Sequence, residues 1–364
     1  MRRRWQLALP VLLAVAVSVS LRPPLPADAE SVGLCPLVDV PGCRQYEPYV
    51  RNALQAATSS IDLVLSSAQW DDVSLWPELV SAKQRGVGVR VLLDCSDWAP
   101  SITSRNRPVL EMLQEAGVDV RFDSPEITTH AKLLIIDGQL SVIGSSNWNA
   151  HALQEQWQAA VAVTSRSVAS TFTEYADRLW NATLPSAGIL APPPTRREPD
   201  PTVVPLPDTD ACANYASWLL PHLEAAERSI HVVMYRISYY AGFGDSVSNH
   251  IIDALIHAAA RGIDVRVVLD DCAPYPESAR ANLEAAILLD LSGVDVRLDR
   301  PEITTHAKLI IIDERDVFVG STNWNYYALE RNNEASIALL EVPLAAVEFE
   351  RFFSLAWQAG SAVR

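Results

Sequence analysis

The chain repeats one pattern of hydrophobic and polar positions in its two halves. In each half, an apolar run typical of a strand precedes a helical pattern that ends at Gly, and a second apolar run then ends at Asp. Another helical pattern and a polar segment precede a third apolar run. The matching segments are 60–68 and 229–237 (strand), 76–86 and 251–262 (helix), 87–94 and 263–270 (strand), 107–117 and 281–293 (helix), and 130–137 and 306–313 (strand). This alternation predicts an α/β fold in which helices cover a sheet and a site lies near the carboxyl ends of parallel strands.

Sequence identity between the halves shows that they are copies of one another. The nine residues PEITTHAKL occur at 125–133 and again at 301–309, and GSSNWN at 144–149 corresponds to GSTNWN at 320–325. The offset between the copies is 176 residues here but 169 further upstream, so the second copy carries about seven extra residues near YYAGFGDSVS (239–248). The chain is therefore an internal duplication.

The duplication predicts two domains, at 30–182 and 211–364, joined by a linker at 183–210. The linker is rich in proline, which cannot form a regular helix or a central strand, so we expect a semi-rigid connection. Residues 1–29 begin with MRRRWQ, continue with a mostly apolar stretch and end in Ala27-x-Ala29. This succession predicts a signal peptide cleaved after Ala29 and a secreted or periplasmic protein. The alternative is an uncleaved membrane anchor, which the shortness of the apolar stretch disfavours.

The charge of the protein is strongly acidic. The formal net charge is −15, and removal of residues 1–29 would take away four Arg and one Asp and bring it to −18. Nucleic-acid binding generally needs a positive surface, so a nucleic-acid partner is possible but disfavoured.

The five cysteines follow the repeat, apart from Cys35. Cys43 and Cys212 occupy equivalent places, and Cys95 and Cys272 each follow the Asp at the end of a predicted strand within two residues. In an exported protein this arrangement predicts the disulfides Cys43–Cys95 and Cys212–Cys272. A disulfide between Cys35 and Cys43 is the alternative.

The polar residues of the repeated segments suit a phosphoryl group. Along a strand His130 and Lys132 project to the same side, while Asp137 projects to the other, and Ser145 and Asn147 also share a side. Lys, Ser and Asn can hold phosphoryl oxygens, while His acts as nucleophile or acid. A lone His on a strand is more often structural, but the same set recurs in the second copy. That set is His306, Lys308, Asp313, Ser321 and Asn323. Lys beside each His repels a metal ion, so we expect neither a metal nor another cofactor.

The spacing His-x-Lys-x4-Asp, followed after six intervening residues by Gly-Ser-x-Asn, resembles the signature of the phospholipase D superfamily, and both copies match it without a gap. The resemblance covers essentially the whole chain after residue 29. It implies two α-β-α domains related by a pseudo-twofold axis, whose motifs meet in one active site. By this resemblance His130, Lys132, Asp137, His306, Lys308 and Asp313 are the catalytic residues. One His would attack phosphorus and the other would protonate the leaving alcohol and then activate water.

The resemblance also assigns residues that orient the histidines. Some family members carry Glu 28 residues after the motif His, a place that Glu334 occupies in the second copy and Gln158 in the first. Because a carboxylate favours imidazolium, this spacing predicts that Glu334 keeps His306 protonated as the acid and that His130 is the nucleophile. A structural role for Gln158 is the alternative, as is compensation by Glu126 or Glu155. Asp137 and Asp313 are also expected to hold backbone at strand ends or to contact the neighbouring copy.

The motif does not separate the substrates of the superfamily. We expect a monomeric phosphodiesterase that releases the head-group alcohol from phospholipids at a membrane or micelle surface. A secreted endonuclease is the alternative, a cardiolipin-synthase-like transferase is less favoured, and two intact motifs argue against a non-catalytic scaffold. Trp148 and Trp324 favour the core over a pocket wall. Other aromatic residues lie in irregular segments that either form a lipid interface or pack inward, namely Trp70, Trp76, Trp98, Tyr239, Tyr240 and Phe243.

Overall fold

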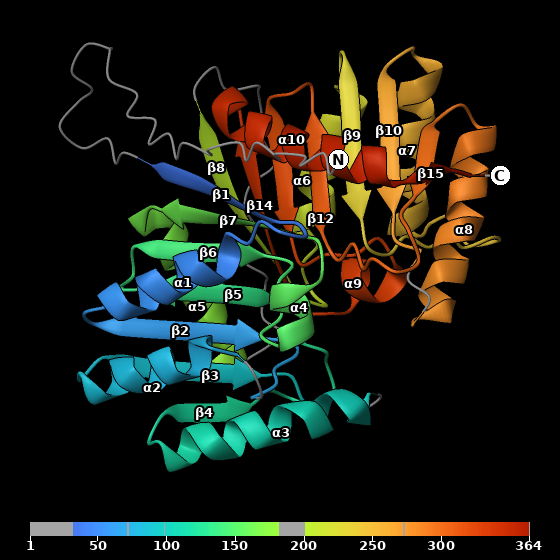
Figure 1. Cartoon of the computed structure of the whole chain (residues 1–364). Coiled ribbons are helices and arrows are strands. Elements are labelled where there is room, and N and C mark those ends of the chain that lie inside the picture. Colours follow the sequence, from blue (N-terminus) through green and yellow to red (C-terminus); the bar gives the residue numbers. More distant parts are fainter. Residues whose placement is uncertain (1–31, 71–72, 98, 182–200, 272–273, 364) are drawn as a thin grey trace, which may run out of the picture. The chain divides into compact units, whose positions relative to one another are not determined.

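The structure is a computed structural model that describes residues 32–70, 73–97, 99–181, 201–271 and 274–363. Both repeats lie in one compact unit, Val32–Arg364. Each repeat forms its own mixed sheet with helices packed against it (Figure 1). Among the described residues, no helix combines the length and the apolar character that a membrane crossing needs.

The first repeat forms a seven-stranded sheet in the order β1-β7-β6-β5-β2-β3-β4. The neighbours β2, β3 and β4 are parallel, and the pairs from β2 through β5, β6 and β7 to β1 are antiparallel. Its strands are β1 (Gly33–Asp39), β2 (Ser60–Leu65), β3 (Gly88–Leu93), β4 (Asp119–Phe122), β5 (Lys132–Ile136), β6 (Leu140–Gly144) and β7 (Gln158–Thr164).

The second repeat forms an eight-stranded sheet in the order β15-β11-β10-β9-β12-β13-β14-β8. It repeats the first sheet strand for strand and adds the short strand β15 beside β11. Its strands are β8 (Thr202–Asp208), β9 (Ser229–Met234), β10 (Asp264–Leu269), β11 (Asp295–Leu298), β12 (Lys308–Ile312), β13 (Asp316–Gly320), β14 (Glu334–Leu340) and β15 (Ser361–Ala362).

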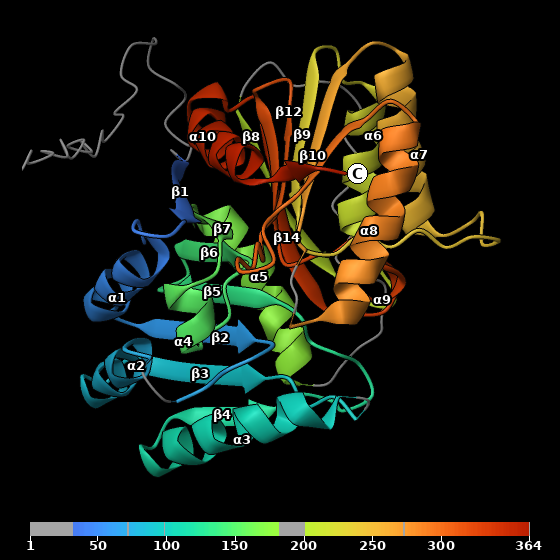
Figure 2. The ribbon, with the colours of Figure 1, turned by 45° about the vertical axis from the view of Figure 1, so that its right-hand side comes forward.

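Helices cover the sheets, as the alternating pattern predicts. Figure 2 shows α1, α2 and α3 lying together along the first sheet, and α6, α7 and α8 along the second. The helices of the first repeat are α1 (Tyr46–Ala56), α2 (Leu75–Gln84), α3 (Pro100–Glu115), α4 (Ala150–Gln154) and α5 (Arg166–Trp180). Those of the second are α6 (Asn214–Glu224), α7 (Val247–Ala260), α8 (Pro276–Leu291), α9 (Tyr326–Glu330) and α10 (Pro343–Ala359).

The central strands are buried on both faces. Along β2, for example, Leu63 and Leu65 belong to a core formed by the first repeat alone, whereas Val64 belongs to a second core. That second core is shared, because it joins residues of both sheets with α5 and α10. This burial explains why the strands read as continuous apolar runs, and the shared core fuses the two repeats.

The two tryptophans after the Asn residues lie in the core, as the sequence favours. Trp148 and Trp324 are fully buried. Each donates its indole N–H to a buried tyrosine hydroxyl, Trp148 to Tyr46 at 3.1 Å and Trp324 to Tyr215 at 3.0 Å. These bonds anchor the loops that carry Gly-Ser-x-Asn.

The predicted linker, 183–210, is too long at its C-terminal end. Residues 202–208 form β8, which pairs with β14 along its whole length. β8 is the edge strand of its sheet, where proline is tolerated because one side needs no N–H donor. The prolines of this segment therefore exclude a central strand but not an edge strand.

The predicted disulfide Cys43–Cys95 is wrong. Both thiols are free, and so is that of Cys35, which excludes the alternative pairing as well. Cys43 follows β1 and Cys95 follows β3, and these strands lie five places apart in the sheet. That separation is about 24 Å at about 4.8 Å per strand, far beyond the span of a disulfide. The second predicted pair involves Cys272, which lies outside the described residues.

Candidate active site

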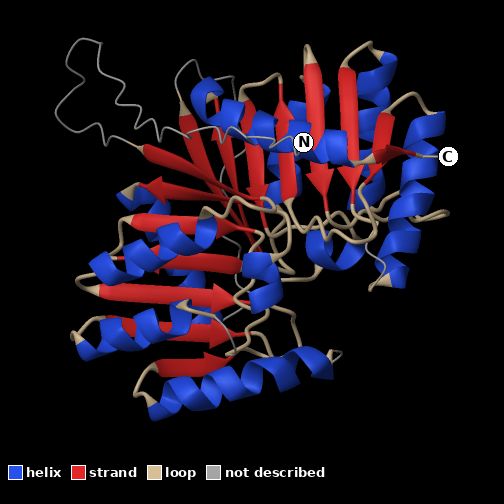
Figure 3. Ribbon diagram, viewed as in Figure 1, coloured by secondary structure: helices blue, strands red, loops and turns tan. Residues whose placement is uncertain are grey.

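Both repeated motifs lie at the sheet edge where the parallel strands end. β5 begins at Lys132, which lies opposite Leu65 at the end of β2, and β12 begins at Lys308, opposite Met234 at the end of β9. Each motif histidine stands two residues upstream, just beyond its strand. Figure 3 shows the arrowheads of β2, β3, β9 and β10 pointing toward loops at the centre of the view.

The PEITTHAKL segments hold the two repeats together at this edge. Thr129 bridges Asn333 of the second repeat, and Thr305 bridges Trp157 of the first. The backbone N–H of His130 donates to the Asn333 carbonyl at 2.8 Å, and that of His306 donates to the Trp157 carbonyl at 2.9 Å. Each segment thus makes the same contact with the opposite repeat, which accounts for its duplication and brings both histidines to one site.

His130 is oriented by Glu334, which belongs to the other repeat. Its Nδ1 lies 2.9 Å from Glu334 Oε2 and 3.0 Å from Oε1, and the carboxylate is fully buried. Because a carboxylate only accepts, Nδ1 carries the hydrogen and Nε2 keeps its lone pair. The prediction that Glu334 acts on His306 is therefore wrong. The prediction assumed that Glu334 orients the histidine of its own repeat, whereas the bridges between the repeats place it beside the histidine of the opposite repeat.

His306 instead meets neutral acceptors from the first repeat. Its Nδ1 lies 3.0 Å from the Ser145 carbonyl and 3.3 Å from Gln158 Oε1. Gln158 Nε2 in turn donates to Gln156 Oε1 at 2.7 Å, which fixes the amide with its oxygen toward the histidine. The two histidines thus differ in one charge beside Nδ1.

The pKa values of both histidines are lowered. Burial is the main cause for His130, with Glu334 opposing it and Lys132 adding to it. Burial also lowers the pKa of His306 well below its usual range, and Lys308, Lys132 and His130 lower it further. Both imidazoles are therefore neutral at pH 7, and an anion bound beside them would raise both pKa values.

The two motif lysines lie close enough to repel each other. Lys132 and Lys308 are buried, and each Nζ donates to the carbonyl of its own motif histidine at 2.5 Å. Burial lowers the pKa of Lys132 to about 7. Burial and the charge of Lys132 lower the pKa of Lys308 well below its usual range. Two buried amines that repel each other form a site for an anion such as a phosphodiester.

The predicted phosphate-binding residues divide into two groups. The buried hydroxyls of Ser145 and Ser321 donate to Gln158 and Glu334 respectively, so they hold the orienting residues and do not fit a phosphate-binding role. Asn147 and Asn323, in contrast, each have a buried Oδ1 without a hydrogen-bond partner among the described residues. The two ends of an Asn amide exchange on rotation about χ2, so the unpartnered end can present N–H to an oxyanion.

The glycine before each serine is required by close packing of strands. A Cβ on Gly144 would lie 2.3 Å from the Ala160 Cβ, and one on Gly320 would lie 2.4 Å from the Ser336 Cα. The Gly of Gly-Ser-x-Asn thus lets β6 and β13 approach their neighbours and sets the position of the serine.

Buried aspartates at the ends of β3 and β10 also position the motifs. The backbone N–H of Thr129 donates to Asp94 at 2.7 Å, and that of Thr305 donates to Asp270 at 2.7 Å. Burial raises the pKa of Asp94 to about 6 against hydrogen bonds that lower it. Neither residue was predicted from the sequence, although both close the aligned strand segments 87–94 and 263–270.

Tyr235 is a second residue that sequence reasoning missed. Its ring lies 4.6 Å from that of His306 and 4.7 Å from Lys308 Nζ. The upstream offset of 169 places Ser66 at the equivalent position in the first repeat. No motif marks this tyrosine, and only comparison of the two copies distinguishes it.

Asp137 and Asp313 lie at the opposite end of their strands, so a catalytic role does not fit their place. Asp137 lies five positions after Lys132 along the strand, a span of about 17 Å. The Asp137 carboxylate accepts from the backbone N–H groups of Thr58, Ser59 and Ser60. Asp313 does the same for Glu227, Arg228 and Ser229. Both aspartates adopt a positive φ of 55° and hold the loop before the first parallel strand.

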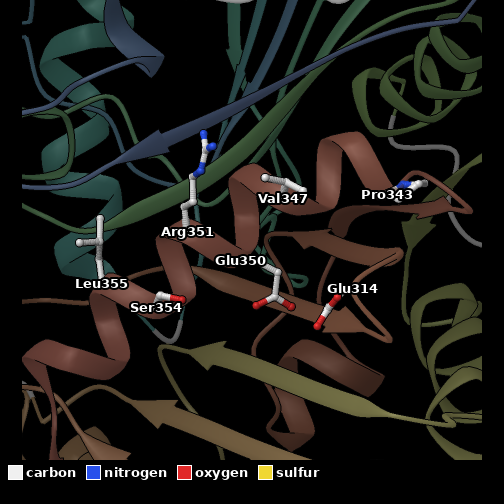
Figure 4. A pocket seen from close by; sticks show the side chains of 7 residues that line it. All are labelled: Glu314, Pro343, Val347, Glu350, Arg351, Ser354 and Leu355. Carbon is white, nitrogen blue, oxygen red and sulfur yellow. The ribbon is translucent and has the colours of Figure 1, made fainter. Parts of the chain in front are cut away.

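An open hollow of about 590 Å³ lies along α10 (Figure 4). Its lining contains none of the motif residues and consists of Glu314, Pro343, Val347, Glu350, Arg351, Ser354 and Leu355. The described residues also contain no group of three or more His, Cys, Asp or Glu side chains arranged to hold a metal. The two-histidine site is therefore the candidate active site.

A duplicated mixed α/β fold with two His-x-Lys motifs at one edge is the arrangement expected of the phospholipase D superfamily, and the chain belongs to that superfamily. The family described as "Cardiolipin synthase, PLD-like domain" matches it twice, at residues 50–180 and 219–357.

Curated relatives match one part of the chain. Human mitochondrial cardiolipin hydrolase is 30% identical over 141 residues, which are 39% of this chain and 53% of the relative. Phospholipase D of Rickettsia typhi is 32% identical over 146 residues, 39% of this chain and 63% of the relative. The chain thus spans between half and two thirds of the length of these relatives.

Solved structures share the fold across both repeats. Phosphatidylserine synthase of Haemophilus influenzae Rd KW20 superposes with a TM-score of 0.67 at 12% identity, over 87% of this chain and 85% of that one. Polyphosphate kinase of Porphyromonas gingivalis superposes with a TM-score of 0.58 at 15% identity, over 90% of this chain and 50% of that one.

Proposed function

We propose that the protein is a phosphodiesterase that hydrolyses phospholipids to phosphatidate and the head-group alcohol through a phosphohistidine. The observation that carries the mechanism is the difference between the two histidines. A buried carboxylate lies at Nδ1 of His130, while neutral oxygens lie at Nδ1 of His306. Phosphorylation of Nε2 while Nδ1 keeps its hydrogen creates a cationic ring, which Glu334 stabilises. His130 is therefore the nucleophile.

The first step forms the bond between His130 Nε2 and phosphorus as the bond from phosphorus to the head-group oxygen breaks. His306, protonated when the anionic substrate is bound, gives its Nε2 proton to the leaving oxygen. Because neutral groups surround its Nδ1, His306 is the stronger acid of the pair. Lys132, Lys308 and the two Asn amides hold the nonbridging oxygens.

In the second step, His306 Nε2 takes a proton from water, and the water oxygen attacks phosphorus. The bond from phosphorus to His130 breaks, which releases phosphatidate and returns both histidines to their starting states. An alcohol in place of water would give transfer of the phosphatidyl group, which is the transferase alternative.

The names of the relatives support a lipid substrate over DNA. Mitochondrial cardiolipin hydrolase and phospholipase D are the names of proteins that match this chain at about 30% identity. The net charge of −15 also argues against a polyanionic duplex. We further propose export, which rests on the sequence of residues 1–29. Mass spectrometry of the protein recovered from its native cell would detect cleavage after Ala29.

A paired assay tests the substrate proposal. The purified protein is incubated with EDTA and either phosphatidylcholine vesicles or plasmid DNA, beside the His130→Ala variant. We expect release of choline by the wild type, none by the variant, and no nicking of the plasmid. Plasmid nicking that depends on His130, without choline release, would contradict the proposed phospholipid hydrolysis and favour the endonuclease alternative.

A further inference from the structure

Exposed aromatic side chains gather on the second repeat. Phe243 is 72% exposed and Tyr327 58%, and Tyr239 and Tyr326 are exposed by 42% and 40%. We call these four residues the aromatic rim. Tyr239 and Phe243 belong to the loop between β9 and α7, which projects in Figure 2, and the other two begin α9. Large apolar side chains left in water are informative when they gather at one place.

The loop that carries Phe243 is ordered by buried polar contacts. Asn249 of α7 accepts from the Tyr240 N–H at 2.9 Å and donates to the carbonyls of Tyr240 and Phe243 at 2.9 and 3.0 Å. The hydroxyl of Tyr240 accepts from the Tyr326 N–H at 3.0 Å, which ties the loop to α9. The exposed rings are thus presented by a preformed scaffold and need little ordering on binding.

The aromatic rim adjoins the active site through two segments. Tyr239 lies four residues after Tyr235, whose ring contacts His306, and α9 begins two residues after Trp324 of the second motif. A surface that docks on the rim would lie beside the entrance to the two histidines.

The described residues of the first repeat form no such rim, although its fold is the same, and Trp98 lies outside the described residues. Trp76 is fully buried, and Trp70 stacks on it with ring centres 6.4 Å apart. Ala150 and His151 occupy the positions of Tyr326 and Tyr327. The asymmetry shows that the repeated fold does not require the four exposed rings.

We propose that the aromatic rim docks the protein on the interface of a zwitterionic lipid bilayer. This inference rests on the proposed lipid substrate. Tyr and Phe suit the boundary between head groups and acyl chains. The charged residues on the same segments are mixed, with Asp245 and Glu330 beside Arg331, and the chain contains three lysines, of which two lie in the active site. A protein of net charge −15 is repelled by anionic lipid, so apolar insertion is the source of its affinity.

Vesicle partitioning tests the proposal. The double variant Phe243→Ser/Tyr327→Ser is compared with wild type in sedimentation with phosphatidylcholine vesicles, both in the His130→Asn background to prevent turnover. The matched control is Leu291→Ser/Leu344→Ser, which replaces two leucines that are 82% and 61% exposed. They lie at the C-terminal end of α8 and the N-terminal end of α10, at the end of the sheet opposite the two histidines. We expect the rim variant to lose at least about tenfold in partitioning and the control to bind like wild type. Partitioning of wild type should change little with salt and should weaken when anionic lipid is added.

Hydrolysis of bis(4-nitrophenyl) phosphate, measured with His130 intact, separates this inference from the proposed function. The rim variant should turn over this soluble diester like wild type, which also shows that it is folded. If wild type hydrolyses the soluble diester but does not bind vesicles, or if the rim variant binds them undiminished, the docking proposal is wrong and the phosphodiesterase survives. Vesicle binding that depends on the aromatic rim, without hydrolysis of any phosphodiester, would support the docking proposal and contradict the proposed phosphodiesterase activity.

Discussion

Replacement of Glu334 by Gln removes the charge beside His130 and keeps the size of the side chain. The carboxylate lies 2.9 Å from Nδ1 and is fully buried. Two unit charges about 4 Å apart attract by about 4 kcal/mol at an effective dielectric constant of about 20. The amide retains a neutral hydrogen bond, so we expect a loss of about 2–4 kcal/mol in stabilisation of the cationic phosphohistidine and of the transition state before it.

That loss corresponds to a fall of about 30- to 1000-fold in kcat/KM, since about 1.4 kcal/mol is a factor of ten. The assay is hydrolysis of a soluble phosphodiester, with thermal unfolding as the control for folding. Gln158→Glu is the matched variant, because it adds the same charge beside His306. It should raise the pKa of His306 and slow the first step by weakening the acid. An effect of Glu334→Gln below about fivefold, in a folded protein, would refute the role of the carboxylate.

Three further predictions follow from the same contacts. Lys132 must be charged and has a pKa of about 7, and His306 must be protonated although its pKa is well below its usual range, so kcat/KM should fall as pH rises and be low above about pH 7. The lowered pKa of His130 keeps this nucleophile neutral at pH 6.5, and kcat should extend to higher pH than kcat/KM because the bound anion stabilises the charged groups. A kcat/KM that rises to pH 9 would contradict this. Asp137→Asn should lower stability by about 1–3 kcal/mol at pH 7 and leave kcat within about twofold, as measured by urea unfolding and steady-state assay. Burial alone would raise the pKa of Asp137, but the N–H donors outweigh it and hold the pKa well below its usual value. The stability that Asp137 provides is therefore present above about pH 4 and lost as pH falls through the lowered pKa. A large fall in kcat of Asp137→Asn with unchanged stability would restore a catalytic role. Gly144→Ala places a methyl group 2.3 Å from the Ala160 Cβ and should cost about 1–3 kcal/mol or more in unfolding free energy, whereas an unchanged melting temperature would refute the close packing of β6 on β7.

Much of the fold can be predicted from the sequence because the same pattern of apolar and polar segments occurs in both halves of the chain. Apolar runs locate the central strands, and the duplicated His-x-Lys segments locate the site edge. The edge strand β8 was missed because its prolines are typical of a linker. The sequence pattern alone cannot show that β8 pairs with β14 on one side only and so needs no backbone N–H donors on the other. The prediction of the Cys43–Cys95 disulfide failed because two cysteines that recur at equivalent places in both repeats need not be near one another within a repeat.

The division of labour at the site could be predicted only in part. The sequence singles out Glu334 and Gln158, but their partners depend on how one repeat meets the other. The structure exchanges them, so that Glu334 contacts His130 and Gln158 contacts His306. We still propose His130 as the nucleophile, but for a different reason, which is that the carboxylate would stabilise the phosphorylated ring. Tyr235 and Asp94 carry no motif, and only their three-dimensional contacts mark them.

The position of the covalent phosphoryl group tests the central claim most directly. The protein is mixed with a short-chain phosphatidylcholine, quenched in alkali within the first turnover, and mapped by peptide mass spectrometry. The account predicts a phosphatidyl group on His130 in the wild type, and its accumulation there in His306→Asn. A modified His306, or accumulation in His130→Asn but not in His306→Asn, would contradict it.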